Sequence, residues 1–158
     1  MELPQVRSNK ILIFPSGQIN INNCYVEDLF ALFNMPRQYY LLEDEIMLFV
    51  LDQEYGELSI YVDSLNEAIV ELHIEFFEDL DWESFRAKFL PAPPIRYVYI
   101  AYGQEIYVVF SKNFCARLSK DGKKVACLLF FRTDYIQACI GEFTESILQA
   151  SEREGGLN

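Results

Sequence analysis

The sequence predicts an α+β fold, in which a mostly antiparallel sheet of about six or seven strands carries three helices. Strand-like segments follow one another in pairs, and two of these pairs flank the turn sequences Gly103-Gln104 and Asp121-Gly122. Apolar residues spaced three or four positions apart precede Pro36 and follow Asp81 and Thr133, which is typical of amphipathic helices. We therefore expect at least two hairpins and an amphipathic helix near the C-terminus.

The composition favours one folded domain. The chain has 158 residues, of which 51% are hydrophobic and 15% aromatic, enough to build a sizeable core. We expect this domain to cover residues 1–150 and the polar tail 151–158 to fray. No apolar run reaches the roughly 18 residues that a membrane-spanning helix needs, and the N-terminus lacks the pattern of a secretory signal.

The N-terminal elements are predicted from short apolar runs and helix signals. Residues 1–10 are polar and are expected to be extended, and Ile11–Phe14 is a predicted strand that ends at Pro15. Asn22-Asn23 is expected to start a helix that stops before Pro36. The apolar residues of this helix are Val26, Leu29, Phe30 and Phe33.

Strand signals dominate the middle of the chain. Residues 46–51 and 58–62 flank a turn-like segment, so they form a predicted hairpin. Residues 64–72 fit two structures, because Ser64 and Glu67 match a helix capping box while the residues from Val70 onward alternate as in a strand. We expect a short lead-in followed by a strand.

The C-terminal half contains a helix, two hairpins and a second helix. Asp81 is expected to cap a helix that buries Trp82, Phe85 and Phe89 before three prolines end it. Residues 96–101 pair with 105–111, and residues 114–118 pair with 125–131. Thr133 is expected to cap the final helix. The buried stripe of that helix is Ile136, Ile140, Phe143 and Ile147.

The four cysteines are expected to be free thiols in a cytoplasmic protein. No pair has the C-x-x-C spacing, and with one histidine in the chain a structural zinc site is not expected. The only disulfide worth testing joins Cys115 and Cys127. A two-residue turn at Asp121-Gly122 pairs Ala116 with Cys127 and places the two cysteines on opposite faces, whereas a slip of one residue would align the sulfurs but mix the polar and apolar faces. Free thiols indicate a reducing compartment.

Charge is strongly segregated along the chain. Between Arg37 and Arg86 there are fourteen carboxylates and no Lys or Arg. The other residues hold thirteen bases and ten acids, so the net charge of −11 is the sum of −14 and +3. Nucleic acids and anionic membranes are polyanions, so this chain is not expected to bind either one directly.

No catalytic residue, metal ligand or cofactor is expected. The run Asp79-x-Asp81-x-Glu83 resembles the start of a calcium loop, but Ser84 and Leu90 stand where that loop needs glycine and glutamate. His73 is the only imidazole, has no nucleophile beside it in a catalytic pattern, and is interpreted as a solvated residue. Phosphate-binding glycine motifs are absent. We therefore expect a protein that is not an enzyme.

The leading hypothesis is a non-catalytic, acidic module that inhibits or neutralises a basic partner protein, such as a toxin or a nucleic-acid enzyme whose phosphate site the carboxylates would occupy. Tyrosines among carboxylates suit a basic protein surface, because Tyr anchors an interface and acids steer the encounter. Bacterial immunity proteins and phage-encoded inhibitors are similar to this chain in size and charge. The expected partner-binding residues are Glu57, Tyr61, Asp63, Glu71, His73, Glu75, Glu78, Asp79, Asp81 and Glu83.

The alternative hypothesis is a dimeric chaperone for a secreted effector. The predicted element order from Cys24 to Leu148 resembles that of small acidic type III secretion chaperones in topology, whereas the hairpin over residues 114–131 departs from it. This resemblance implies a homodimer with exposed apolar grooves. Whether the chain is a homodimer is left open by the sequence.

Overall fold

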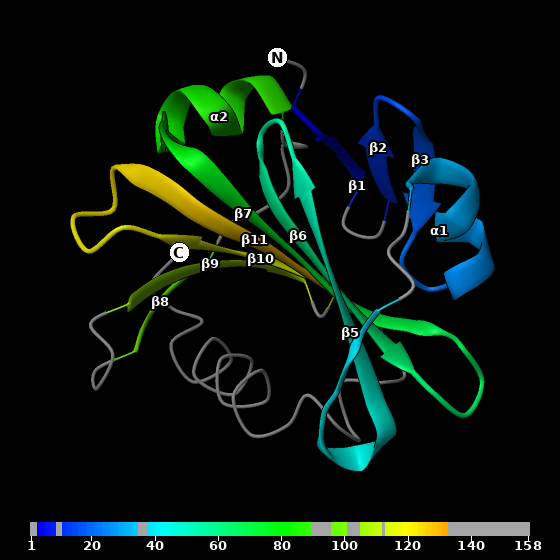
Figure 1. Ribbon diagram of the computed structural model, residues 1–158. Coiled ribbons are helices and arrows are strands. Elements are labelled where there is room, and N and C mark those ends of the chain that lie inside the picture. Colours follow the sequence, from blue (N-terminus) through cyan, green and yellow to red (C-terminus); the bar gives the residue numbers. More distant parts are fainter. Residues whose placement is uncertain are drawn as a thin grey trace.

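The computed structural model describes residues 3–8, 11–34, 38–89, 96–100, 105–111 and 113–132. These residues form eleven strands, two α-helices and one short 3-10 helix, η1 (Figure 1). The strands are β1 (Gln5–Ser8), β2 (Ile11–Phe14), β3 (Gly17–Asn20), β4 (Tyr40–Leu41), β5 (Ile46–Gln53), β6 (Gly56–Asp63), β7 (Ile69–Asp81), β8 (Arg96–Ile100), β9 (Glu105–Ser111), β10 (Phe114–Leu118) and β11 (Lys124–Phe131). The helices are α1 (Val26–Leu32), η1 (Glu43–Glu45) and α2 (Trp82–Phe89).

Eight strands form one antiparallel sheet in the order β4-β5-β6-β7-β11-β10-β9-β8, and β1, β2 and β3 form a separate sheet. The large sheet consists of two meanders of four strands, β4 to β7 and β8 to β11, which α2 separates in sequence. They join where β7 pairs with β11. Neighbours in sequence pair within each meander, and only the β7–β11 pair connects distant parts of the chain.

The predicted fold class is wrong in its architecture. The sheet of six or seven strands is a sheet of eight, and a second sheet of three strands accompanies it. β1 and β3 have four residues each, which is too short to show a periodic pattern, and their buried residues Val6 and Ile19 are held by tertiary packing. Two of the three expected α-helices lie in the described part of the chain. The C-terminal helix from Thr133, the tail 151–158 and Cys139 lie outside the described residues.

The main core lies between the large sheet and a layer made of β1–β3, α1 and α2 (Figure 1). We call the side of the large sheet that faces this layer the first face, and the opposite side the second face. Every second residue of β6 faces this layer, and these residues are apolar. Leu58, Ile60 and Val62 are fully buried there. α2 adds Trp82 and Phe85, which are also buried.

Several elements confirm the sequence-based predictions. The hairpins β5–β6, β8–β9 and β10–β11 occur where they were expected. The ambiguous segment is a turn over residues 64–66 followed by strand β7. Asp81 caps α2, because its Oδ2 accepts a hydrogen bond of 2.9 Å from the backbone N–H of Ser84.

The predicted register of the β10–β11 hairpin is wrong. Leu118 pairs with Val125 as expected, but Cys127 lies opposite Arg117, and Ala116 pairs with Leu128. The register shifts between Arg117 and Leu118, so one residue of β11 is left over as a β-bulge. The shift reverses the faces of the strand beyond it, as a one-residue slip must. Cys127 and Cys115 consequently share the second face.

The helix expected to start at Asn22-Asn23 begins at Val26 instead. The Asn20 side chain accepts a hydrogen bond from the backbone N–H of Asn22, which holds this stretch in a turn. Of the predicted apolar face of α1, Phe30 is 54% exposed while Leu29 is fully buried. Within the described residues no helix has the length and apolar character needed to cross a membrane.

Candidate functional site

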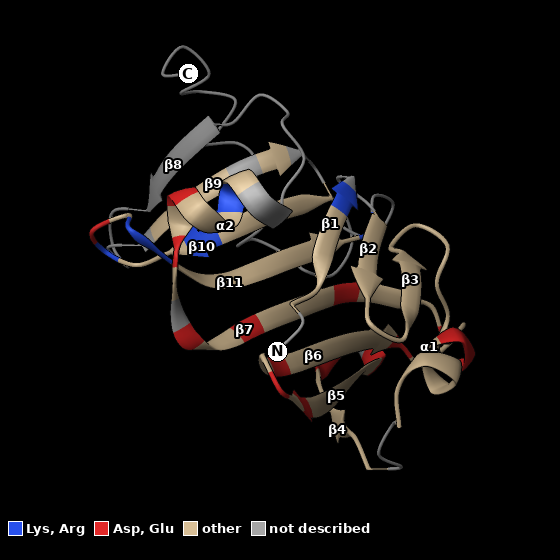
Figure 2. Cartoon of the chain, turned by 90° about the horizontal axis from the view of Figure 1, so that it is seen from above, with Lys and Arg blue, Asp and Glu red and all other residues tan. Residues whose placement is uncertain are grey.

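The base-free segment becomes one contiguous part of the large sheet. Residues 38–85 form β4, η1, β5, β6, β7 and the first turn of α2, and the four strands are adjacent in the sheet. Acidic residues mark these strands in Figure 2, whereas basic residues lie on the β10–β11 hairpin, on α2 and on β1. The acidic residues that cluster in the sequence therefore also cluster in space, because a meander places consecutive strands side by side.

Nine of the ten predicted partner-binding residues lie on β6 and β7, and six of them lie in the stretch where these two strands run side by side. The register sets Glu57 opposite Glu75 and Tyr61 opposite Glu71, with His73 between the two glutamates of β7. Directly opposite residues share a face, so these side chains lie together on the second face. Asp63, the sixth residue, lies at the end of β6, where its Oδ1 accepts a hydrogen bond from the backbone N–H of Leu65.

The other four predicted residues lie apart from this group, at the far end of β7 and the start of α2. Asp81 is occupied as the helix cap, and Glu83 makes an ion pair of 2.8 Å with Arg86. Glu78 and Asp79 belong to the last residues of β7. The structure therefore divides the predicted surface into two separate places.

His73 is not the solvated residue that the sequence indicated. Its Nε2 contacts Oε1 of Glu71, whose side chain is 10% exposed, and its own side chain is 23% exposed. The ring of Tyr61 lies 4.9 Å from the imidazole. Burial, and then the charge of Glu71, raise the pKa of the Tyr61 hydroxyl. Glu71 is the only buried carboxylate among the residues whose burial the structure describes.

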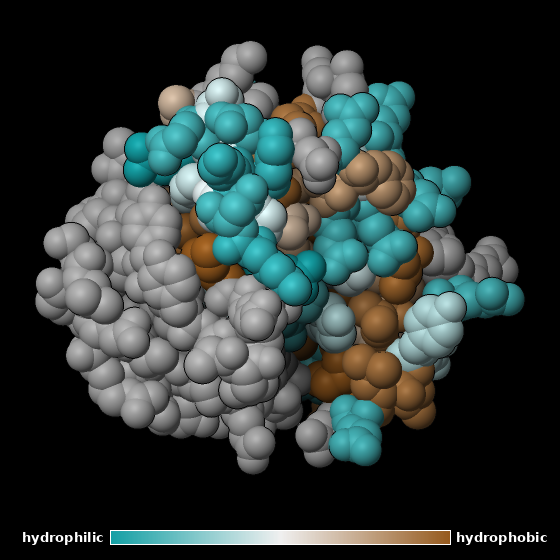
Figure 3. All heavy atoms as spheres, turned by 90° about the vertical axis from the view of Figure 1, so that its left-hand side faces the viewer, coloured by the Kyte–Doolittle hydropathy of each residue, from teal (hydrophilic) through white to brown (hydrophobic). Residues whose placement is uncertain are grey.

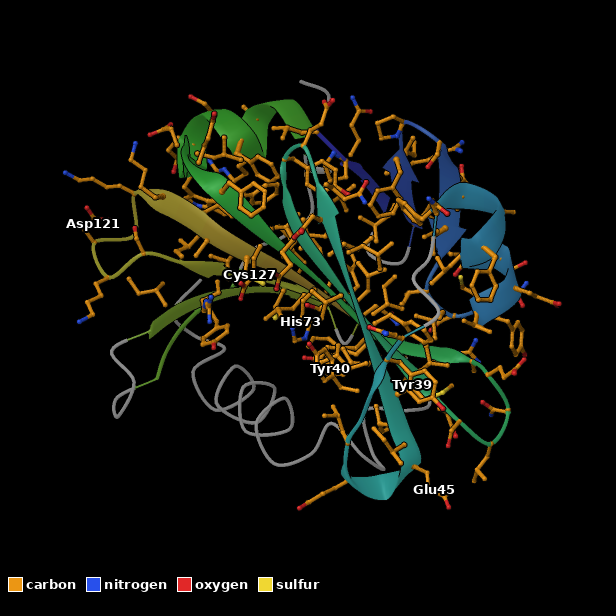
Figure 4. The ribbon with its side chains drawn as sticks, viewed as in Figure 1. Tyr39, Tyr40, Glu45, His73, Asp121 and Cys127 are labelled. Atoms are coloured by element: carbon orange, nitrogen blue, oxygen red, sulfur yellow. The ribbon has the colours of Figure 1, made fainter. Side chains whose placement is uncertain are left out.

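The described cysteines are poorly suited to nucleophilic chemistry with His73. His73 and Cys127 both lie near the middle of the sheet, while Asp121 is at the tip of the β10–β11 hairpin (Figure 4). Burial raises the pKa of Cys127 to about 12, although Arg117 opposes the shift. Burial also raises the pKa of Cys115 well above its ordinary value. A thiolate is the reactive form of cysteine, and it is strongly disfavoured here.

We predict that Cys24, Cys115 and Cys127 resist alkylation in the native protein. All three thiols are buried and unbridged, and burial raises the pKa of Cys24 to about 12 as well. Iodoacetamide at mildly alkaline pH should label these residues only after denaturant is added, as mass spectrometry of the peptides would report. Fast labelling of Cys127 in the folded chain would contradict the prediction.

The most unusual electrostatic feature is a row of three carboxylates across adjacent strands. Asp52 of β5 lies opposite Glu57 of β6, and Glu57 lies opposite Glu75 of β7. Neighbouring strands are about 4.8 Å apart, so the three charges repel one another along the row. We call this row the acidic ladder. Arg117, two strands further on, approaches Glu75 at 3.6 Å.

Exposed apolar residues and a groove lie at the edge of the acidic strands. The chain from Tyr39 to Leu42 is exposed, with Leu41 at 69%, and Tyr39 packs against Phe49 with the ring centroids 5.5 Å apart. Hydrophobic side chains gather at the lower right of Figure 3, the side on which β4 and β5 lie. Beyond β4, a groove of about 890 Å³ is lined by residues 15–16, 32–34 and 50–55.

The predicted list omitted Asp52 and the groove. The sequence placed Asp52 in the turn between two predicted strands, because Glu54-Tyr55 is not a favoured two-residue turn sequence. In the structure a two-residue turn joins β5 to β6, which makes Gln53 and Gly56 the closing pair and sets Asp52 opposite Glu57. The groove had no sequence signal. Its walls come from the β2–β3 turn, the end of α1 and β5, and only the packing of the two sheets brings these together.

Within the described residues no three His, Cys, Asp or Glu side chains are grouped so that they could hold a metal ion. No protein-family model, curated protein or solved structure matches this chain. Its function is therefore inferred from the residues and their geometry.

Proposed function

We propose that the chain is a non-catalytic module that binds and neutralises a basic partner protein through the second face of its acidic strands. The observation that carries this proposal is the acidic ladder of Asp52, Glu57 and Glu75. Like charges placed directly opposite each other destabilise a sheet. Lys or Arg side chains of a partner would remove that repulsion on binding, so the free protein holds an arrangement that favours a cationic ligand.

Exposure supports the same proposal. Asp52 is exposed, the Glu75 side chain is 54% exposed, and Glu57 is partly exposed, so all three carboxylates can reach a partner. The whole base-free part of the sheet has one sign of charge, which accelerates encounter with an oppositely charged protein. Tyr40, opposite Leu48 at the sheet edge and 66% exposed, supplies an aromatic anchor of the kind that dominates interfaces.

The central residue of the ladder gives the sharpest test. We expect Glu57→Gln to weaken binding of the basic partner by about tenfold, since it removes the charge that faces both neighbours. The same change should raise the free energy of unfolding slightly, by roughly 0.3 kcal/mol, because it removes repulsion. The matched control is Glu27→Gln, an exposed carboxylate outside the acidic strands, which should leave binding unchanged. Because Glu27 lies in the first turn of α1 and interacts favourably with the helix dipole, this change should lower the free energy of unfolding slightly instead of raising it.

The partner would be captured from an extract of the source organism at low salt, identified by mass spectrometry, and then titrated in purified form by calorimetry. Support requires a basic protein whose binding weakens at high salt and in Glu57→Gln but not in Glu27→Gln. If no basic protein is retained at low salt, or if the two variants bind equally, the proposal is wrong.

The dimeric chaperone stays an alternative because of the exposed apolar residues from Tyr39 to Leu42. Such residues at a sheet edge suit self-association or contact with an apolar segment. A strict monomer in sedimentation would rule out the chaperone, since that hypothesis requires a homodimer and the acidic module does not.

A further inference from the structure

Within the part of the chain that the structure describes, strand β5 has an unpaired edge over half its length. It has eight residues, all paired with β6, but β4 pairs with Leu48 and Met47 alone. Among the residues that the structure describes, no strand lies beside β5 from Phe49 to Gln53. An open edge of this kind is a template for an additional strand.

The backbone groups on that edge belong to Val50 and Asp52. In an antiparallel sheet the N–H and C=O groups of alternate residues point to opposite neighbours. The carbonyl of Ile46 accepts a hydrogen bond of 2.8 Å from Leu42, on the β4 side, so the even-numbered residues of β5 point outward. The carbonyl of Asp52 agrees with this pattern, because it accepts a hydrogen bond from the side-chain amide of Gln53 instead of from β6.

The groove of about 890 Å³ extends along this same stretch of β5. Its charged lining residues are Asp52 and Glu54, both exposed and both acidic, and no basic residue of the described chain lines it. Leu32 and Phe33, at the end of α1, supply an apolar wall on the side of the first face. An edge strand, an apolar wall and acidic charges together match an extended cationic peptide.

We propose that an extended segment of the basic partner enters this groove and pairs with β5 at Val50 and Asp52 as an added strand of the sheet. The proposal rests on the proposed function and names the part of the partner that is bound. Side chains opposite Val50 and Asp52 would lie on the second face, beside the acidic ladder, and those opposite Leu51 would lie toward Leu32 and Phe33. The fitting segment therefore alternates Lys or Arg with apolar residues.

The probe is a capped peptide of alternating lysine and valine, titrated into the full chain by calorimetry and by NMR. The control peptide has the same charges but carries N-methyl groups on the backbone amides of its lysines, which are the donors that would face β5. We expect the first peptide to shift the amide signals of Val50 and Asp52, and the methylated peptide to bind at least tenfold more weakly.

A pair of protein variants tests the same contact from the other side. Val50→Pro removes the outward N–H but no hydrogen bond to β6, a position where an edge strand tolerates proline. Val50→Ala keeps the N–H and is the matched control. We expect Val50→Pro to lose at least tenfold in affinity for the lysine-valine peptide and Val50→Ala to change it less than threefold. If Val50→Pro fails to fold, the comparison of the methylated and unmethylated peptides on the native chain still tests whether the peptide pairs with β5.

The outcomes separate this proposal from the proposed function. If both peptides bind equally, added-strand pairing is wrong, while binding that is lost in Glu57→Gln and at about 1 M salt would still support the acidic module. If only the unmethylated peptide binds, and neither salt nor Glu57→Gln matters, pairing holds and the acidic module is wrong. Absence of binding, or self-association of the chain through the Val50 edge, overturns the added strand.

Discussion

Replacement of Phe130 by alanine is expected to lower the free energy of unfolding by about 3–5 kcal/mol. The Phe130 ring is fully buried and stacks on Phe114, with the centroids 4.5 Å apart and the planes at 7°. Phe114 in turn stacks on Phe110 at 4.6 Å. Truncation removes one ring from this series and leaves a cavity at the centre of the first face, on the strand that joins the two meanders.

The measurement is chemical denaturation of both proteins under two-state conditions. Phe77→Ala is the matched control, because Phe77 is a phenylalanine of β7 with 65% of its surface exposed. Phe77→Ala should lower the free energy of unfolding by no more than about 0.5 kcal/mol, as for most surface substitutions. A loss below about 1 kcal/mol in Phe130→Ala would show that this ring is not part of a tightly packed core.

Replacement of Gly56 by alanine is expected to destabilise the protein by about 3 kcal/mol or more, through a steric clash with backbone. A Cβ at this position would lie 1.8 Å from the carbonyl oxygen of Glu75 and 2.9 Å from the Cα of Phe76. Gly56 pairs with Phe76 at the start of β6, so the clash falls where β6 and β7 are hydrogen-bonded to each other. Neither neighbour can move without breaking strand pairing.

Gly122→Ala is the matched control for this prediction. Gly122 has φ +73°, but a Cβ there would meet nothing closer than the Cδ1 of Ile106 at 3.6 Å. Its cost is the left-handed backbone alone, about 1–2 kcal/mol. Thermal and denaturant unfolding of the two variants should therefore rank Gly56→Ala as the more damaging. Equal losses would mean that the sheet shifts to accept the methyl group.

Gly56→Ala also bears on the proposed function, because Gly56 precedes Glu57, the central residue of the acidic ladder. A displaced start of β6 would change how Glu57 faces Asp52 and Glu75. Gly56→Ala therefore tests the geometry of the acidic ladder as well as the packing of the sheet.

Long, well-alternating elements could be predicted from the sequence, and short or irregular ones could not. The alternation of Leu58, Ile60 and Val62 identified β6 and its buried side, and the turn at Asp121-Gly122 identified the last hairpin. The same hairpin shows the limit, because a bulge of one residue moved Cys127 to the other face. A bulge depends on the neighbours of both strands, which local pattern does not contain.

The candidate site divides in the same way. Placing Glu57, Tyr61 and Asp63 on one face of a strand needed only a period of two, and the structure has them so. Burial of Glu71 against His73 could not be anticipated, since an alternating polar residue is ordinarily solvated. The groove beside Val50 depends on α1 and the β2–β3 turn, which are distant in sequence from β5.

The sequence by itself determined that the charged residues among 38–85 are all acidic and that this segment contains two or three strands and the start of a helix, because composition and alternation are local properties. Only the tertiary structure decided that Asp52, Glu57 and Glu75 stand in one row and that the edge of β5 opens on a groove. The physical reason is that register and edge exposure arise from which strands pair and what packs beside them. Those are long-range contacts, and a local pattern of residues does not specify them.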